Sequence, residues 1–350
     1  MDRFLILLLA AAALIQAACT SPVQRFNAEY FVFGTLVEVE LADTTESAAA
    51  EIFTQLQQEF QRLHRDWHAW EPGTLSDINA AIKAGKSHPL PDDLRQLILQ
   101  SQELERQSGG RFNATIGELI GAWGFHTSEY PVLGPPPGAD LIRELLNRQP
   151  SSHDLKIDNA QLRSTNPAVQ LDFGGIAKGA AVDRAIRLIR TAGVPAALVN
   201  AGGDLRAFGR PGGQPWRIAI QNPFGGILGG VEIDQDEALF TSGNYQRFRQ
   251  DQNQRYSHII DPRSGWPVPD VAAVTVITRH GARGDAAATA LVVAGKRDFL
   301  AVAAELAIDQ ALLVDSNGEI LLTDGMRYRL PDLAGLKIKI SAAAESADRD

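Results

Sequence analysis

Cysteine is almost absent from this sequence, since Cys19 is the only one among 350 residues. Beyond residue 19 the chain therefore has no disulfide, no thiolate nucleophile and no cysteine-ligated zinc or iron–sulfur cluster. Any metal ion that the folded part binds must be held by oxygen or histidine ligands.

Positive charge is also in short supply. The chain has 33 lysines and arginines against 42 aspartates and glutamates, which gives a formal net charge of −9. Such a surface repels nucleic acid, so no nucleic-acid partner is expected. Several well-known catalytic signatures are missing as well. The sequence has no Walker A loop, no GxGxxG, no GxSxG and no HExxH.

Long apolar runs are limited to Phe4–Ile15, which is too short to span a bilayer. Arg3 precedes this run and Ala17, Ala18 and Cys19 follow it, in the order of a secretory signal peptide. A cysteine directly after small residues resembles the bacterial lipoprotein signal. We expect residues 1–18 to be such a signal and Cys19 to be lipidated, which anchors the protein on the periplasmic side of a bacterial envelope. The alternative is ordinary secretory cleavage near Ala18.

The composition of the remainder is that of a globular protein with a real core, at 45% hydrophobic and 21% charged residues. We expect a linker at 19–28, one domain at 29–335 and a polar tail at 336–350. Strand and helix patterns are interspersed without the strict alternation of a doubly wound fold. The sequence therefore predicts an α+β fold with mixed, largely antiparallel sheets packed with helices.

Periodicity predicts the individual elements. Strands are expected at 30–41, 155–157, 169–171, 196–199, 216–221, 231–233, 256–260 and 274–278. Helices are expected from 46 to about 65, with Asp43 and Glu46 as a capping pair, from Pro91 to Gly109, after the GPPPG loop at 134–138, from Ala177 onward, and at 282–295. Asn317 and Gly318 mark the tip of a hairpin.

The stretch LDFGGIAKGAAVDRAI, at 171–186, is unusual for a plain connection. Asp172 ends a predicted strand, Gly174 and Gly175 follow, and a helix begins with Lys178 in its first turn. A helix N-terminus offers free N–H groups and a partial positive charge, which favour a phosphate. Lys178 can contact such a group as a point charge. The alternative is a tight strand-to-helix turn that Asp172 caps.

The stretch ARGDAAATALVVAG supplies a second candidate site. Asp285 and Thr289 are four residues apart and therefore share one helix face. Their carboxylate and hydroxyl provide two oxygens for a hard cation, and Mg²⁺ commonly takes only one or two protein carboxylates, completing its shell with water and phosphate. The alternative is that Asp285 caps the helix and Thr289 bonds the carbonyl one turn back.

The stretch YSHIIDPRSGWPV contains a lone histidine, His258, at a predicted strand end. Histidine is the side chain best suited to proton transfer near neutral pH, although a structural role is the alternative. The remaining histidines show no spacing typical of a metal site. NAGGDLRAFG and TSGNYQRF each add a glycine turn that is weak in isolation.

Taken together, these stretches resemble the ApbE-type FAD:protein FMN transferase family. The resemblance also rests on GTLVEVE, WHAWEPGTLSDIN and FNATIGELIGAWGF, which occur in the family's order between about Phe33 and Gly295. It implies an enzyme that binds FAD and Mg²⁺, attaches FMN through a phosphoester to a Thr or Ser of a target flavoprotein, and releases AMP. Two alternatives are a Mg²⁺-dependent FAD pyrophosphatase that gives FMN and AMP, and a non-catalytic flavin-binding lipoprotein.

The resemblance also implies roles for individual residues. His258 matches the base that deprotonates the acceptor hydroxyl. The Gly175 carbonyl, Asp285 and Thr289 match the family's metal ligands, and Asp285 is also expected to be catalytic. The remaining positions are expected to bind FAD: Asp172, Lys178, the FNATIG residues Asn113, Ala114 and Thr115, and the ring-lining Phe33, Trp70 and Ile260. Asn113 stands where many members carry aspartate.

Overall fold

The computed structural model describes residues 23–244 and 247–330. The expectations for the signal peptide, for Cys19 and for the tail at 336–350 fall outside these residues. Among the described residues, no helix combines the length and the apolar character needed to cross a membrane.

The centre of the fold is an eight-stranded sheet in the order β1-β2-β7-β8-β11-β14-β15-β16, with every neighbouring pair antiparallel. Its strands are β1 (Arg25–Val32), β2 (Thr35–Ala42), β7 (Ala196–Ala201), β8 (Asp204–Phe208), β11 (Asp236–Gly243), β14 (Val271–Thr278), β15 (Gln310–Asp315) and β16 (Ile320–Leu322). The predicted α+β class with largely antiparallel sheets is confirmed.

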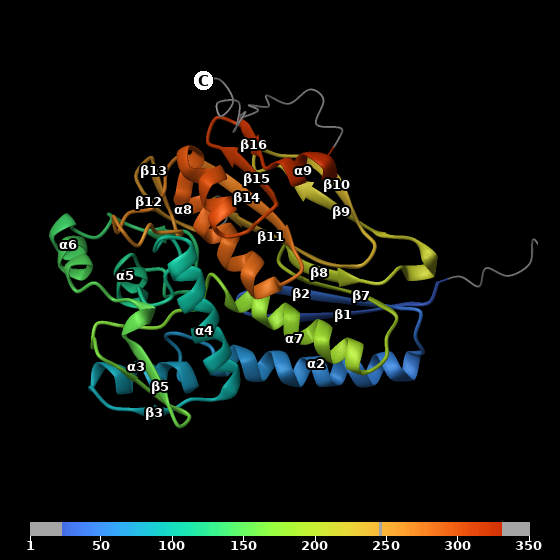
Figure 1. Ribbon diagram of the computed structural model, residues 1–350, viewed down its shortest axis with the longest axis horizontal. Helices are drawn as coiled ribbons and strands as arrows, with labels where there is room; N and C mark the ends of the chain where they lie inside the picture. The colour runs from blue at the N-terminus through green and yellow to red at the C-terminus, as the bar shows by residue number, and fades with distance from the viewer. Residues whose placement is uncertain (1–22, 245–246, 331–350) are drawn as a thin grey trace, which may run out of the picture.

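Both faces of this sheet are covered, because alternate residues of a strand point to opposite sides. In β7, Ala197 and Val199 pack with α2 (Glu46–Asp66) and α7 (Ala177–Thr191). Ala196 and Leu198 instead join a second core with the hairpin of β9 (Trp216–Gln221) and β10 (Ile227–Ile233) and with α9 (Asp324–Arg329). Figure 1 shows α2 and α7 below the sheet, α8 (Gly281–Glu305) to the left of β11 and β14, and the hairpin with α9 at the upper right.

A smaller helical region extends the helix-covered side. It contains α3 (Thr74–Lys83), α4 (Asp92–Gln107), α5 (Gly117–Ala122) and α6 (Ala139–Asn147). Two three-stranded sheets lie in it: β3 (His88–Pro89), β6 (Gln161–Ser164) and β5 (Leu155–Asp158) form one, and β13 (Gln254–Ser257), β12 (Phe248–Asp251) and β4 (Val132–Leu133) form the other. α3 and α4 share their core with α8, so this region is continuous with the main sheet (Figure 1).

Two predictions at the N-terminal side need correction. The linker expected at 19–28 already contains the start of β1, which begins at Arg25. The single strand expected at 30–41 is two strands joined by a tight turn at Phe33 and Gly34, whose φ angles are 57° and 66°. Apolar alternation continues through this turn, so only Gly34 signalled it.

Other boundaries also differ from expectation. Thr45, and not Asp43, caps α2, by accepting a hydrogen bond from the Ala48 N–H at 3.3 Å. Residues 169–171 form no strand of the described sheets, since only an isolated bridge joins Gln170 to Ile116. The strand expected at 256–260 ends at Ser257. Helix α8 continues to Glu305 beyond a break at Gly295, where φ is 66°.

Candidate functional site

The N-terminal ends of α7 and α8 touch, and glycine makes this possible. A Cβ at Gly179 would lie 2.2 Å from the Gly281 carbonyl oxygen, which no side chain tolerates. The contact brings Asp285, in the first turns of α8, against the start of α7, where its carboxylate accepts the Gly179 N–H at 3.0 Å. The Asp285 side chain is buried there, with 3% of the residue exposed.

Two side chains with oxygen ligands, Asp285 and Thr289, lie at this junction beside the glycine turn. A Cβ at Gly175 would lie 3.2 Å from Thr289 Oγ1, so the glycine turn passes directly over that hydroxyl. Thr289 Oγ1 donates to the Asp285 carbonyl oxygen at 3.2 Å and lies 3.3 Å from the Ser242 hydroxyl. The helix-face bond that the sequence offered as an alternative is therefore present, and it leaves the hydroxyl's lone pairs available. A carboxylate, a hydroxyl and a backbone carbonyl form a donor set for a hard cation.

Asp172 acts as a turn residue and also faces the cleft. Its Oδ1 accepts the Gly174 N–H at 2.8 Å, and its own N–H donates to the Ala114 carbonyl at 2.8 Å. Its Oδ2 lies 3.1 Å from Nε2 of His126. Asp172 thus stabilises the turn that contains Gly175. The alternative of a tight turn stabilised by Asp172 is therefore correct in part, since Asp172 also lines the cleft.

Lys178 is held at the same junction by an ion pair with the buried Asp204. A lysine in the first turn of a helix opposes the helix dipole, so local helix stability does not explain it. Burial lowers the pKa of Lys178. Burial also raises the pKa of Asp285, while Lys178 and the Gly179 amide counteract that rise. A bound ligand of opposite charge would therefore stabilise the charged form of either group.

His258 follows directly after β13. Its Nδ1 lies 3.1 Å from the Arg247 carbonyl oxygen. A carbonyl only accepts, so Nδ1 carries the ring proton and the Nε2 lone pair is free. Burial, together with the positive charges of Arg247 and Lys178, lowers the pKa of His258 to about 4. The imidazole is therefore an unprotonated base at neutral pH.

These groups line one cleft with a volume of about 200 Å³. The segments that form it lie far apart in the sequence and meet where α7, α8, β11 and the chain after β13 converge. Its lining includes Thr35, Trp70, Arg111, Phe112, Asn113, Ile116, Phe125, Tyr130, Asp172, Gly174, Gly175, Lys178, Ser242, Arg247, His258, Ile260, Asp285 and Thr289.

Most of the predicted site residues line this cleft, but three do not. The Phe33 ring lies edge-on to Phe60 and His64, with centroids 6.1 and 5.9 Å away. Ala114 is buried and contributes its carbonyl to Asp172. Thr115 is fully buried and donates its hydroxyl to Asn113 Oδ1 at 2.6 Å. These three residues support the lining and do not form it.

Among the residues of the cleft region that sequence reasoning missed, Arg247 and His126 stand out. Arg247 lines the cleft with a guanidinium 5.7 Å from the Tyr130 ring centroid, and it belongs to the TSGNYQRF stretch that offered only a glycine turn. His126 stacks on Trp70, with ring centroids 4.8 Å apart and planes 14° from parallel. It closes the GAWGFH segment, and nothing local marked it.

The structure also corrects the expectation that the other histidines lack metal-type spacing. His64 and His68 are four residues apart, at the end of α2 and just beyond it. One nitrogen of each and a Glu71 carboxylate oxygen all lie within 4.8 Å of one another. The sequence contained this spacing, but we expected the helix pattern to stop at about Arg65, so the second histidine was not placed beside the first.

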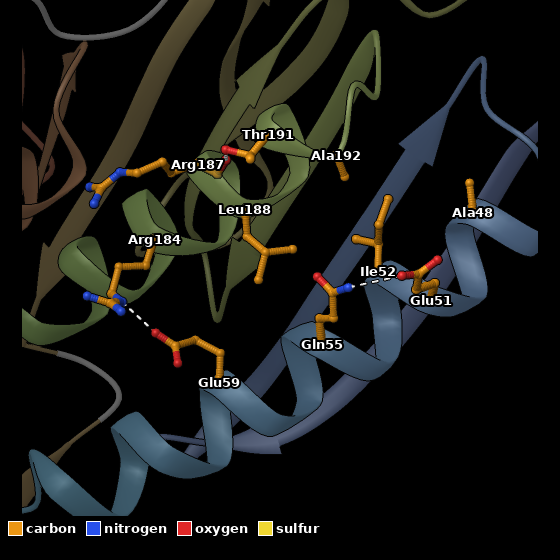
Figure 2. A pocket seen from close by; sticks show the side chains of 10 residues that line it. All are labelled: Ala48, Glu51, Ile52, Gln55, Glu59, Arg184, Arg187, Leu188, Thr191 and Ala192. Atoms are coloured by element: carbon orange, nitrogen blue, oxygen red, sulfur yellow. Dashed lines mark hydrogen bonds and ion pairs between the residues drawn. The ribbon is translucent and has the colours of Figure 1, made fainter.

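A larger hollow, of about 650 Å³, lies between α2 and α7 (Figure 2). None of the predicted site residues lines it. Two of its charged side chains already have partners: Arg184 pairs with Glu59 at 2.5 Å, and Glu51 accepts a hydrogen bond from Gln55 (Figure 2). Lys178, His258 and Asp285, whose pKa values are shifted mainly by burial, all line the smaller cleft, which is therefore the candidate active site.

Comparison with known proteins identifies the family. Residues 33–313 match the model of the ApbE family. The FAD:protein FMN transferase of Rhodobacter capsulatus is 41% identical over 321 residues, covering 90% of this chain and 60% of its own. That of Klebsiella pneumoniae (strain 342) is 31% identical, covering 74% of this chain and 80% of its own.

Solved structures give the same result. The apo form of the Pseudomonas stutzeri flavinyl transferase ApbE superposes with a TM-score of 0.77 at 31% identity, covering 88% of this chain and 96% of its own. The Thermotoga maritima ApbE protein gives 0.80 at 26% identity, covering 88% and 99%. The antiparallel core thus has the fold of these ApbE structures. This chain belongs to the ApbE family.

Proposed function

We propose that this protein transfers FMN from FAD onto a Thr or Ser hydroxyl of a target flavoprotein and releases AMP. The observation that carries the proposal is the convergence in one cleft of a neutral imidazole, an oxygen donor set and two cationic side chains. The relatives named FAD:protein FMN transferase support the reaction class. The chain spans 60% of the length of the Rhodobacter capsulatus relative.

The residues present fit a magnesium ion. Asp285 would supply one carboxylate, Thr289 a hydroxyl and Gly175 its backbone carbonyl, and all three residues line the cleft. No sulfur or nitrogen ligand lies among them, which matches the oxygen preference of Mg²⁺. When bound, the ion neutralises charge on the phosphates.

Cationic side chains complete the phosphate environment. Lys178 and Arg247 both line the cleft, and Lys178 stands in the first turn of α7, next to the Gly179 N–H that the Asp285 carboxylate accepts. We place the diphosphate of FAD along this end of α7. Trp70, with 41% of the residue exposed, and Ile260 offer apolar surfaces for a ring of FAD.

His258 is the proposed general base. Its Nε2 takes the proton of the acceptor hydroxyl, and the hydroxyl oxygen then forms a bond to the phosphorus of the FMN moiety. The phosphorus–oxygen bond to AMP breaks, and AMP leaves with that oxygen. The Arg247 carbonyl keeps the imidazole in the required tautomer through Nδ1. The product is an FMN phosphoester on the acceptor.

One incubation separates this proposal from its alternatives. The purified protein is mixed with FAD, Mg²⁺ and a candidate acceptor domain, and the products are analysed by mass spectrometry and chromatography. An acceptor that gains one FMN, with an equal amount of AMP, supports the transferase. Free FMN with AMP and an unmodified acceptor indicates a pyrophosphatase. FAD that stays intact indicates a binding protein and contradicts the proposal.

The proposal extends to the location of the protein. The order of Arg3, the apolar run and Cys19 supports export and a lipid anchor on the periplasmic side of a bacterial envelope. One acyl chain binds membranes only weakly, so stable anchoring needs more than one. Mass spectrometry of protein taken from membranes is expected to find an acylated Cys19 as the first residue, and an unmodified N-terminus contradicts the anchor.

A further inference from the structure

A second group of metal-type ligands lies outside the donor set of Asp285 and Thr289. His64 belongs to the last turn of α2, His68 follows the end of that helix, and Glu71 is three residues further on. Their ligand atoms lie within 4.8 Å of one another. His68 Nε2 and Glu71 Oε1 are 3.6 Å apart.

This spacing suits a tetrahedral ion. Two ligands about 2.1 Å from a zinc ion in tetrahedral geometry stand about 3.4 Å apart, close to the separation of His68 and Glu71. Two imidazoles and one carboxylate are typical ligands of zinc and related first-row cations and not of magnesium. The two donor sets therefore differ in the metal that they select.

The surroundings favour a cation here. The C-terminal end of a helix carries a partial negative charge, and His64 lies in the last turn of α2. Within the described residues no hydrogen-bond partner reaches the ring of His64, although this ring is only partly exposed. A half-buried imidazole with a free lone pair is available to a ligand.

The ligands also connect to the cleft through a series of ring contacts, of which the first two are edge-on. His64 contacts His68 at a centroid distance of 5.3 Å, and His68 contacts Trp70 at 4.3 Å. Trp70 lines the cleft and stacks on His126, which bonds Asp172. An ion at this position therefore fixes the short segment 68–71 that places Trp70 at the mouth of the cleft.

Metal binding requires one local rearrangement. His68 Nδ1 accepts the Glu71 backbone N–H at 3.1 Å, so a neutral ring carries its proton on Nε2, the nitrogen that faces the carboxylate. An ion takes the place of that proton on Nε2. The ring proton moves to Nδ1, and the hydrogen bond from the Glu71 N–H to Nδ1 breaks. The segment 68–71 therefore shifts on loading, and Trp70 shifts with it.

We propose that His64, His68 and Glu71 bind one zinc-like divalent cation at the mouth of the cleft, separately from the oxygen donor set. This inference does not rest on the proposed transferase reaction. It concerns metal selection and the position of Trp70, and both can be measured without turnover.

The test is a metal titration of the purified, chelator-treated protein in excess Mg²⁺. With Zn²⁺ we expect one equivalent per chain that Mg²⁺ does not displace, and with Co²⁺ the visible absorption of a tetrahedral nitrogen–oxygen site. Trp70 should report loading through a change in tryptophan fluorescence that Trp70→Phe removes. His64→Ala and His68→Ala should each weaken binding at least about tenfold, since even outer-shell changes cost that much.

Control variants distinguish loss of a ligand from a general effect on the protein. Glu71→Gln, on a side chain that is 58% exposed, preserves the fold and should also weaken Zn²⁺ binding. His153→Ala, on an exposed histidine, and Asp285→Ala should leave it unchanged. The proposal is overturned if no stoichiometric Zn²⁺ binds in excess Mg²⁺, if binding survives all three ligand variants, or if Asp285→Ala removes it.

Discussion

The chemistry proposed for His258 depends on which of its ring nitrogens is occupied. The Arg247 carbonyl holds Nδ1, and the cleft leaves Nε2 free. The same burial that lowers the pKa to about 4 keeps the ring unprotonated at neutral pH, so no proton has to leave before catalysis. A base with so low a pKa is weaker, and its value lies in position more than in basicity.

Replacing His258 separates binding from chemistry. His258→Ala should leave FAD affinity nearly unchanged, since the diphosphate contacts proposed for Lys178 and Arg247 remain. FMN transfer should fall by about 10²–10⁴-fold, the usual contribution of a positioned base. Fluorescence titration of FAD and timed flavinylation of the acceptor measure the two effects, with His153→Ala as the control. Loss of FAD binding makes the residue structural, and undiminished transfer means that another group is the base.

The lowered pKa of His258 also predicts how stability depends on pH. A histidine with a pKa of about 6.5 when unfolded and about 4 when folded takes up its proton in the unfolded chain first. Its stabilising contribution is therefore complete above pH 6.5 and is lost as the pH falls from 6.5 towards 4. Thermal unfolding of the metal-free protein across this range should show a steeper loss for the wild type than for His258→Gln. Parallel curves contradict the buried neutral ring.

Asp285 and Thr289 should differ in how strongly they affect the metal. Asp285→Ala removes the only carboxylate among the proposed ligands and should abolish Mg²⁺-dependent turnover. Thr289→Ala removes a neutral ligand and should raise the Mg²⁺ concentration required while leaving turnover at saturation. Turnover measured over a Mg²⁺ series checks both, with circular dichroism confirming the fold. Near-normal turnover of Asp285→Ala at low Mg²⁺ means that the metal site is misassigned.

At the scale of elements, the site depends on the contact between the first turns of α7 and α8. Two glycines allow the backbones to meet, and Asp183 closes the contact by accepting the Gly281 N–H at 2.8 Å. Because Lys178 and Asp285 lie on these two turns, the distance between the helices sets the distance between the phosphate-binding and metal-binding groups.

Adding one methyl group at this contact should disturb the site. Gly179→Ala places a Cβ 2.2 Å from the Gly281 carbonyl oxygen and forces the helices apart. We expect the free energy of unfolding to fall by about 1–3 kcal/mol, as for other overpacked positions, and Mg²⁺ affinity to fall with it. Chemical denaturation and Mg²⁺ titration measure these effects. Gly138→Ala is the control, since a Cβ there meets nothing within 4 Å. Equal stability of the two variants contradicts the close contact.

Hydrophobic periodicity predicted many of the helices and strands of this fold, but it did not predict how they are connected. The helix from Ala177 and the hairpin around Gly318 match expectation, because their apolar pattern and turn residues agree. The turn at Phe33 and Gly34 was missed because a residue that continues the strand alternation sits in the left-handed region. The segment 169–171 is strand-like in pattern, but the Asn79 side chain, and not a neighbouring strand, bonds both backbone groups of Leu171, at 2.8 and 2.9 Å.

The candidate site was predictable where residues that act together lie close in the sequence, within one motif. Asp172, Gly175 and Lys178 lie in one stretch, and Asp285 with Thr289 in another, so their grouping followed from the sequence. Arg247 and His126 became visible only through tertiary contacts, with Tyr130 and with Trp70. The roles expected of Phe33 and Thr115 came from the family resemblance, and the structure buries both side chains partly or fully beside the cleft.

At the scale of the whole molecule, the main sheet helps to bring the proposed metal ligands and the proposed base together. Strand β11 brings Ser242 next to Thr289 of α8, and the chain after β13 brings His258 to the same cleft. Trp70, from the chain between α2 and α3, and Asp172, from the chain between β6 and α7, also line it. The cleft therefore lies where the main sheet and the smaller helical region meet, a common position for a ligand site.

The central claim is that this one cleft holds FAD, the metal ion and the base. Crystals grown with FAD and Mn²⁺, which substitutes for Mg²⁺ and scatters anomalously, test it most directly. We predict an anomalous peak about 2.1 Å from the Gly175 carbonyl, an Asp285 carboxylate oxygen and Thr289 Oγ1. The diphosphate of FAD should lie beside that peak and Lys178, with His258 facing the FMN phosphorus. The absence of an ion at these three ligands, or FAD bound in the hollow between α2 and α7, would contradict the account.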